Sequence, residues 1–98
     1  MTALLLWLLL LHSPARASTL QDGVNLMKAE KFSEAIRAFE AEMQANPGSA
    51  EVLMNLGWSY WRVGRVEQAW RCFELLVQLD PKNPIYLRLL ADIENARK

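Results

Sequence analysis

The chain has 98 residues, 52% of them hydrophobic, and its 11 basic and 11 acidic residues give a formal net charge of +0 at pH 7. This length predicts one small domain. The balanced charge argues against nucleic-acid binding, which needs a concentrated basic surface to neutralise phosphates. Because Cys72 is the only cysteine, an intramolecular disulfide is excluded.

Residues 2–11 form an almost unbroken apolar run, and Ala15-Arg16-Ala17 follows as a small-x-small tripeptide of the kind that signal peptidase reads. The run is shorter than the roughly 20 apolar residues of a membrane-spanning helix. We therefore predict a secretory signal peptide at residues 1–17, cleaved after Ala17. A buried N-terminal helix of the mature fold and an uncleaved anchor are the two alternatives.

Cleavage would leave a mature chain of 81 residues, 18–98, that we expect to be secreted or periplasmic without stable membrane insertion. It would lose Arg16 and therefore carry 10 basic and 11 acidic residues, a net charge of −1. It would also lose His12, the only histidine.

A repeat appears when the chain is compared with itself at an offset of 34 residues. Identical residues then coincide at several pairs of positions, which include Gly23 and Gly57, Ala35 and Ala69, Phe39 and Phe73, and Pro47 and Pro81. Several identities at one ungapped offset indicate a repeated structural unit.

Apolar residues at spacings of three and four predict helices throughout the repeat. Pro47, Gly64 and Pro81 end three of these helices, and Ser18, Thr19 and Asn83 are suitable N-caps. The predicted helices span Ser18 to Glu30, Phe32 to Ala45, Glu51 to Gly64, Val66 to Leu79 and Pro84 to Lys98. The residues predicted to face inward in the second unit and the last helix are Leu53, Leu56, Tyr60, Val63, Ala69, Trp70, Phe73, Leu76, Val77, Ile85, Leu87, Leu90 and Ile93.

The second unit resembles the tetratricopeptide repeat family in a set of spaced residues: Leu56-Gly57, Tyr60, Gly64, Ala69, Phe73 and Asp80-Pro81. The resemblance implies an all-α solenoid of two antiparallel helix hairpins and a C-terminal solvating helix. The repeats would cover residues 16–49 and 50–83, and the capping helix residues 84–98. Gly57 and Ala69 look like a small pair that lets two helices pack closely. Asp22 and Glu94 replace usual apolar residues at the two ends, whereas Glu42 stands where a small buried residue is typical.

The mature chain lacks the parts of an enzyme. It has no histidine as a general base, no second cysteine for a metal cluster and no glycine-rich phosphate loop. We interpret Glu34, Glu40, Glu67 and Glu74 as solvated and Cys72 as a small residue at the core edge. We therefore predict no catalytic residue, no metal and no cofactor.

In the family that the chain resembles, the first helix of each hairpin lines a concave surface that contacts ligands. One stripe on the predicted helix 51–64 consists of Met54, Trp58 and Trp61, with spacings of four and three. It lies on the side of this helix away from its inward-facing residues. The predicted partner-binding residues are Met27, Lys28, Met54, Asn55, Trp58, Trp61 and Arg62. The stripe is either an exposed site for an apolar protein segment or internal packing of both tryptophans against the last helix.

We predict a non-catalytic adaptor that binds a peptide or helix with an apolar segment. The alternative is a homo-oligomer that buries the same stripe between subunits. A clamp for a carboxylate terminus is disfavoured, because Leu20, Val24, Ile85 and Leu89 occupy positions where that clamp needs polar groups.

Overall fold

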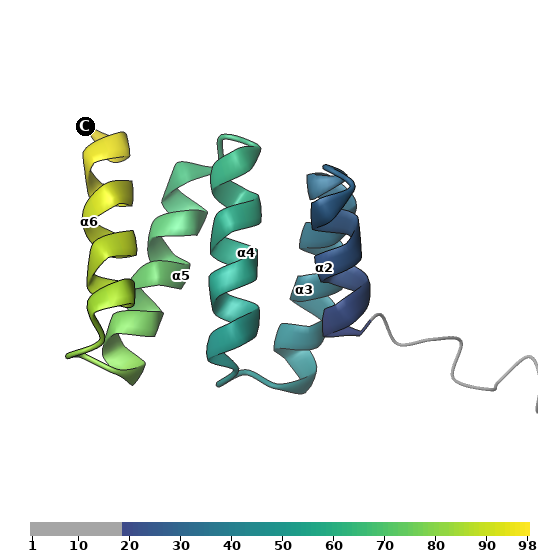
Figure 1. Ribbon diagram of the computed structural model, residues 1–98, viewed down its shortest axis with the longest axis horizontal. Helices are drawn as coiled ribbons and strands as arrows, with labels where there is room; N and C mark the ends of the chain where they lie inside the picture. The colour runs from purple at the N-terminus through teal and green to yellow at the C-terminus, as the bar shows by residue number, and fades with distance from the viewer. Residues whose placement is uncertain (1–18) are drawn as a thin grey trace, which may run out of the picture.

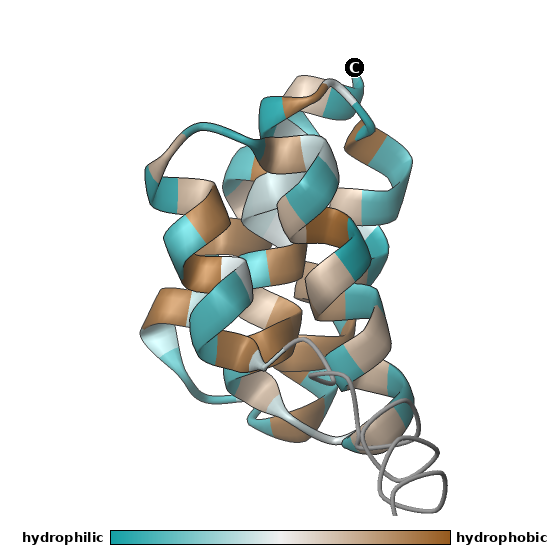
Figure 2. Ribbon diagram, turned by 90° about the vertical axis from the view of Figure 1, so that its right-hand side faces the viewer, coloured by the Kyte–Doolittle hydropathy of each residue, from teal (hydrophilic) through white to brown (hydrophobic). Residues whose placement is uncertain are grey.

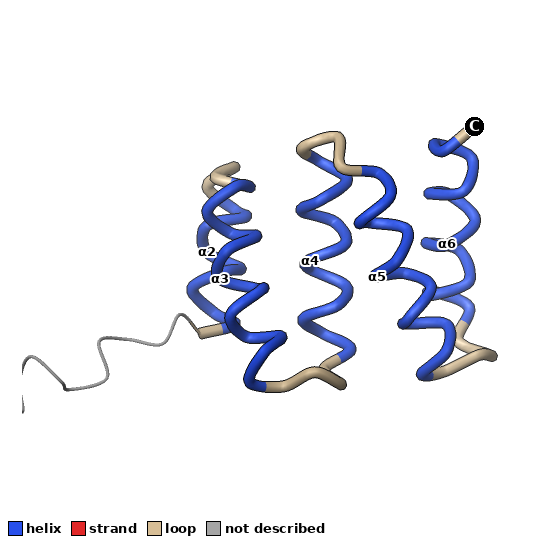
Figure 3. Tube along the Cα trace, turned by 180° about the vertical axis from the view of Figure 1, so that it is seen from behind, coloured by secondary structure: helices blue, strands red, loops and turns tan. Residues whose placement is uncertain are grey.

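The structure is a computed structural model that describes residues 19–98, a part of the chain that contains five α-helices and no strand (Figures 1 and 3). The helices are α2 (Leu20–Lys28), α3 (Phe32–Ala45), α4 (Ala50–Arg62), α5 (Val66–Leu79) and α6 (Pro84–Arg97). Figure 1 shows consecutive helices running up and down side by side. The all-α architecture of two hairpins and a further helix is thus confirmed. The predicted signal peptide lies outside the described residues.

The first helix of each pair begins with a side-chain cap. Thr19 and Asp22 form a reciprocal capping box, in which the Thr19 hydroxyl accepts from the Asp22 N–H at 3.2 Å and the Asp22 carboxylate accepts from the Thr19 N–H at 3.0 Å. Ser49 caps α4 and Asn83 caps α6. The second helices α3 and α5 instead follow Lys31 and Arg65, whose side chains make no cap hydrogen bond.

The turns that join α2 to α3 and α4 to α5 have the same backbone hydrogen bonds. The Lys31 N–H donates to the Leu26 carbonyl at 2.9 Å, and the Arg65 N–H donates to the Tyr60 carbonyl at 2.8 Å. Both turns need a left-handed residue, which is Glu30 with φ 60° in the first and Gly64 with φ 82° in the second. The prediction that Gly64 ends its helix in a left-handed turn is therefore confirmed, although α4 itself stops at Arg62. The predicted end of the first helix at Glu30 was wrong by two residues, since α2 ends at Lys28.

Aromatic rings pack against glycines inside each hairpin. Phe39 and Phe73 are completely buried, and a Cβ atom added at Gly57 would lie 2.5 Å from the Phe73 ring. A Cβ atom at Gly23 would overlap the Phe39 ring in the same way. Ala69 is buried as expected, but the partner that requires Gly57 is the phenylalanine rather than the alanine.

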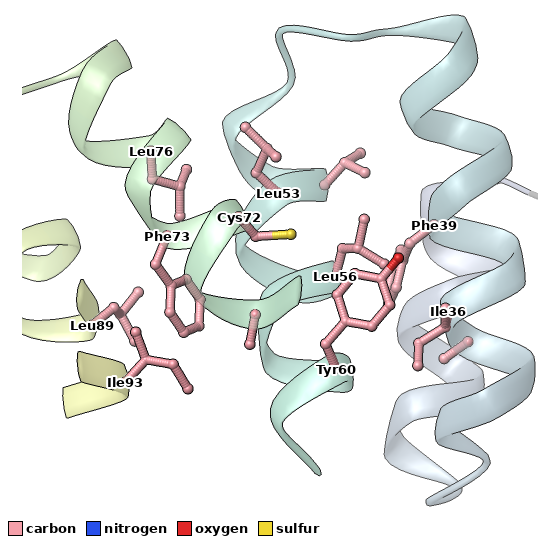
Figure 4. Packing of buried hydrophobic residues seen from close by; sticks show 13 residues of the cluster. Ile36, Phe39, Leu53, Leu56, Tyr60, Cys72, Phe73, Leu76, Leu89 and Ile93 are labelled. Atoms are coloured by element: carbon pink, nitrogen blue, oxygen red, sulfur yellow. The ribbon is translucent and has the colours of Figure 1, made fainter. Parts of the chain in front are cut away.

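The core lies between the facing sides of the helices, and Figure 2 shows hydrophobic and hydrophilic positions alternating along them. In Figure 4, Tyr60 lies toward Ile36 and Phe39 of the first hairpin, whereas Phe73 lies toward Leu89 and Ile93 of α6. The buried residues thus form one continuous cluster across both hairpins and α6.

Three predicted inward residues are exposed. Val63 is 38% exposed because it follows the last residue of α4, in the turn. Ile85 and Leu87 are 61% and 44% exposed. The side of α6 that faces the core instead carries the buried Leu89 and Ile93 and the partly buried Tyr86 and Leu90. The predicted apolar stripe of α6 was therefore half right.

Several acidic residues have structural partners. Glu40 accepts a hydrogen bond from the Tyr60 hydroxyl at 2.9 Å, which links α3 to α4. Glu67 pairs with Arg97 at 2.8 Å, and the Arg97 guanidinium lies 4.0 Å from the centre of the Trp70 ring, which links α5 to α6. Glu42 is half-buried, and its carboxylate accepts from the Asn46 amide at 3.4 Å.

Candidate partner-binding groove

The described residues form an open pocket where the C-terminal ends of α2 and α4 meet the start of α3. Its volume is about 270 Å³. Figure 1 shows these ends at one edge of the molecule, together with the turn between α4 and α5. The pocket, called the α2–α4 pocket below, is lined by Met27, Lys28, Glu30, Phe32, Trp58 and Arg62.

Trp58 is the large apolar side chain that the pocket presents to solvent, with 40% of its surface exposed. Its ring stacks on that of Trp61, with centroids 5.3 Å apart and planes at 15°. Trp61 in turn meets the buried Phe73 edge to face, with centroids 6.3 Å apart. Trp61 therefore holds Trp58 against the core of the second hairpin, and Trp58 faces the pocket on a rigid support.

The two cationic side chains of the pocket, Arg62 and Lys28, differ in their contacts. The Arg62 guanidinium lies 4.7 Å from the centre of the Phe32 ring and 4.0 Å from the Glu30 carboxylate. The Arg62 and Glu30 side chains are 56% and 77% exposed, so water screens their attraction. Lys28 is exposed and makes no ion pair with any described residue. The three charged lining residues thus carry a net charge of +1.

The pocket brings together four of the seven residues predicted to bind a partner: Met27, Lys28, Trp58 and Arg62. Met54 and Trp61 are half-buried and pack on the core, and the Asn55 side chain donates to the Glu51 carbonyl of its own helix at 3.0 Å. The predicted alternative placed both tryptophans against the last helix, whereas the aromatic ring contacts join them to each other and to α5.

Sequence reasoning missed Glu30 and Phe32 as pocket residues. The sequence did contain a signal for this turn, because Glu30 lies at the position in the first repeat that is equivalent to Gly64 in the second. An acidic residue where the turn needs a left-handed backbone is unusual, and it directs attention to that turn.

A second pocket of about 300 Å³ lies between α3 and α5, on a floor of α4 residues. Its lining is Met43, Leu53, Leu56, Tyr60, Gln68, Arg71, Cys72 and Leu75. Burial raises the pKa of the Cys72 thiol to about 11, so the thiol stays protonated and weakly nucleophilic at neutral pH. This agrees with the interpretation of Cys72 as a residue of the core edge.

Residues 19–98 hold no group of three or more His, Cys, Asp or Glu side chains that could bind a metal ion. None of the helices in this range combines the length and the apolar character needed to cross a membrane.

Comparison with solved structures shows the fold. The structure of MamA, residues 41 to the end, from Desulfovibrio magneticus RS-1 superimposes with a TM-score of 0.77. The match covers 91% of this chain and 50% of that chain at 24% sequence identity. Together with the five helices, this likeness establishes an α-solenoid.

Comparison with curated sequences finds much longer relatives. Intraflagellar transport protein 70B of Rattus norvegicus is 35% identical over 57 residues, which are 58% of this chain and 9% of that protein. Cellulose synthase operon protein C of Komagataeibacter xylinus is 34% identical over 68 residues, which are 69% of this chain and 5% of that protein. This chain thus spans a small fraction of the relatives that it matches. The sequence profile described as tetratricopeptide repeat matches residues 26–93, and the chain belongs to the tetratricopeptide repeat family.

Proposed function

We propose that the chain is a non-catalytic protein-interaction module that binds an apolar segment of a partner polypeptide. The binding groove would consist of the α2–α4 pocket and the adjoining stripe of Met54, Trp58 and Trp61. Membership of the tetratricopeptide repeat family supports the general role, because repeats of this family are protein-interaction modules. The proposed contact residues are those predicted from the sequence, with Trp58 as the central anchor.

The observation that carries the proposal is the exposure of Trp58 on a rigid aromatic support. A tryptophan adds about 150–250 Å² of contact surface when a partner covers it. Trp58 is fixed by stacking on Trp61, so binding costs little side-chain entropy. Solvent-exposed tryptophan beside an open pocket is typical of a binding hot spot.

The test is affinity capture from the native source with the wild-type chain, Trp58→Ala and a matched control. Leu79→Ala is the control, because Leu79 is 53% exposed and lies on α5 outside the α2–α4 pocket. We expect Trp58→Ala to lose the bound partner and Leu79→Ala to keep it. Trp61→Ala is unsuitable here, since its ring touches the buried Phe73 and its removal would disturb the core.

An unchanged set of captured proteins in Trp58→Ala would refute the proposal. Sedimentation over a concentration series then separates a partner site from a subunit interface. If the wild-type chain dimerises and Trp58→Ala is monomeric, the same stripe joins two copies instead.

We also propose that the mature protein is secreted or periplasmic after cleavage behind Ala17. The support is the apolar run at residues 2–11 and the Ala15-Arg16-Ala17 tripeptide. The N-terminal sequence of the protein isolated from its native source tests this proposal: Ser18 as the first residue is expected, and an intact Met1 would refute it.

A further inference from the structure

The α2–α4 pocket pairs an apolar wall with a cationic rim, and this pairing specifies more than an apolar ligand. The apolar wall is formed by Met27 and Trp58. The cationic rim consists of Lys28 and Arg62, which lie at equivalent repeat positions on the last turns of α2 and α4. The only acid in the lining is Glu30. A partner that carries a negative charge beside an apolar side chain would complement both features.

We infer that the pocket receives an acidic side chain of the partner next to a large apolar side chain that packs on Trp58, and that Glu30 occupies the carboxylate position while the pocket is empty. This inference rests on the proposed groove function and names the chemistry of its partner. Lys28 and Arg62 are the residues that would hold the partner's carboxylate.

The backbone of Glu30 is the second observation. Glu30 has φ 60°, a left-handed conformation that a side chain with a Cβ atom adopts at a cost. The equivalent turn of the second hairpin uses Gly64, with φ 82° and no such cost. Because glycine would serve the turn, the strained residue at this position points to a role of its carboxylate.

The interaction of Glu30 with Arg62 is weak enough to be exchanged. Their charged atoms are 4.0 Å apart, which is the outer limit for an ion pair, and both side chains are more than half exposed. Arg62 keeps its contact with the Phe32 ring and is therefore held in place whether or not Glu30 stays. Lys28 has no acidic partner among the described residues and is free to take one.

The probe is an array of acetylated and amidated 12-residue peptides that place Trp or Leu one to four positions from Glu, Gln or Lys. The best Glu peptide and its Gln counterpart are then titrated against the full chain by fluorescence anisotropy at low ionic strength. We expect the Glu peptide to bind about five- to tenfold more tightly than the Gln peptide, from two exposed charge contacts. Amidation removes the terminal carboxylate, and a free-acid neutral peptide shows whether a chain terminus binds instead.

Variants assign the preference to residues. Lys28→Gln and Arg62→Gln should each weaken the Glu peptide about threefold and leave the Gln peptide unchanged. Arg71→Gln is the matched control, because it removes the same charge from the second pocket, which lies between α3 and α5. Glu30→Gln should tighten the Glu peptide about twofold, since it removes the competing carboxylate but keeps the side-chain length and the backbone conformation.

The outcomes separate this inference from the proposed function. If the Glu and Gln peptides bind equally and both need Trp58, the acidic preference is refuted and the groove function stands. If the free-acid neutral peptide binds as well as the Glu peptide, the carboxylate comes from a chain end and the inference is wrong. If no peptide binds the wild-type chain more tightly than it binds the Trp58→Ala variant, both the inference and the groove function are refuted.

Discussion

The two hairpins share one backbone design but contribute unequally to the core. In α4 six residues are buried, whereas in α2 only Gly23 is buried. Leu76 is completely buried in α5, but its counterpart Glu42 in α3 is half-buried and polar. The second hairpin therefore supplies most of the core, and the first is held on its edge. Conserving a backbone pattern within a repeat does not conserve the energy of its units.

The largest difference is expected from truncating the equivalent residues Leu76 and Glu42. Leu76→Ala should lower the free energy of unfolding by about 3 kcal/mol, because it opens a cavity at a fully buried site. Glu42→Ala should change it by less than about 0.5 kcal/mol, as expected for a residue that buries little apolar surface. Urea denaturation followed by circular dichroism measures both. Equal losses would show that the hairpins contribute alike.

A smaller difference is expected at the glycines that face the phenylalanine rings. Gly57→Ala should cost about 2 kcal/mol, because its Cβ atom meets the fixed Phe73 ring and this overlap outweighs the better helix propensity of alanine. Gly23→Ala meets Phe39 in the same way, but α2 buries no other residue and can move outward. We therefore expect a loss of about 1 kcal/mol or less there. Thermal denaturation compares the two variants, and a larger loss at Gly23 would contradict the comparison.

The fold was largely predictable because the repeat contains residues that helix packing and helix capping require at fixed positions. The identities at Gly57 and Phe73 and the caps at Thr19 and Asn83 determine helix packing and helix starts. The left-handed turn at Gly64 was predictable because glycine favours it, whereas the turn at Glu30 was missed, because its left-handed backbone arises from the turn and not from its side chain. The α6 stripe was half wrong because periodicity alone does not tell which side of a helix its neighbour covers.

The candidate site was predictable only in outline. The spacing of Trp58 and Trp61 identified an aromatic stripe, but not that one ring would support the other. That division depends on the contact of Trp61 with Phe73, a contact between two helices that helix periodicity does not report. Glu30 and Phe32 were missed because they reach the pocket through the path of the turn between α2 and α3.

The weaker hairpin should also be the easier one to improve. Glu42→Leu places an apolar side chain at the position equivalent to Leu76, where half-burial should stabilise the protein by about 1 kcal/mol. The lost hydrogen bond from Asn46 is long, at 3.4 Å, and exposed, so it offsets little of this gain. The midpoint of urea denaturation should rise. A fall would mean that the Glu42 carboxylate contributes to the packing of α3 on α4.

The smallest expected effect concerns the two left-handed turn residues and has opposite signs in the two hairpins. Glu30→Gly should stabilise the protein by about 0.5–1 kcal/mol, because relief of the strain at φ 60° exceeds the extra entropy that glycine gives the unfolded chain. Gly64→Ala should destabilise it by a similar amount, since its φ of 82° strains any side chain although no atom lies close to an added Cβ. Glu30→Gln keeps the strain and removes only the charge, so its melting temperature should stay near that of the wild-type chain. Both variants remove the charge, but only Glu30→Gly also removes the strain. If the two are equally stable, the backbone of Glu30 adds no strain energy, and the turns of the two hairpins differ only in the charge of Glu30 and its pair with Arg62.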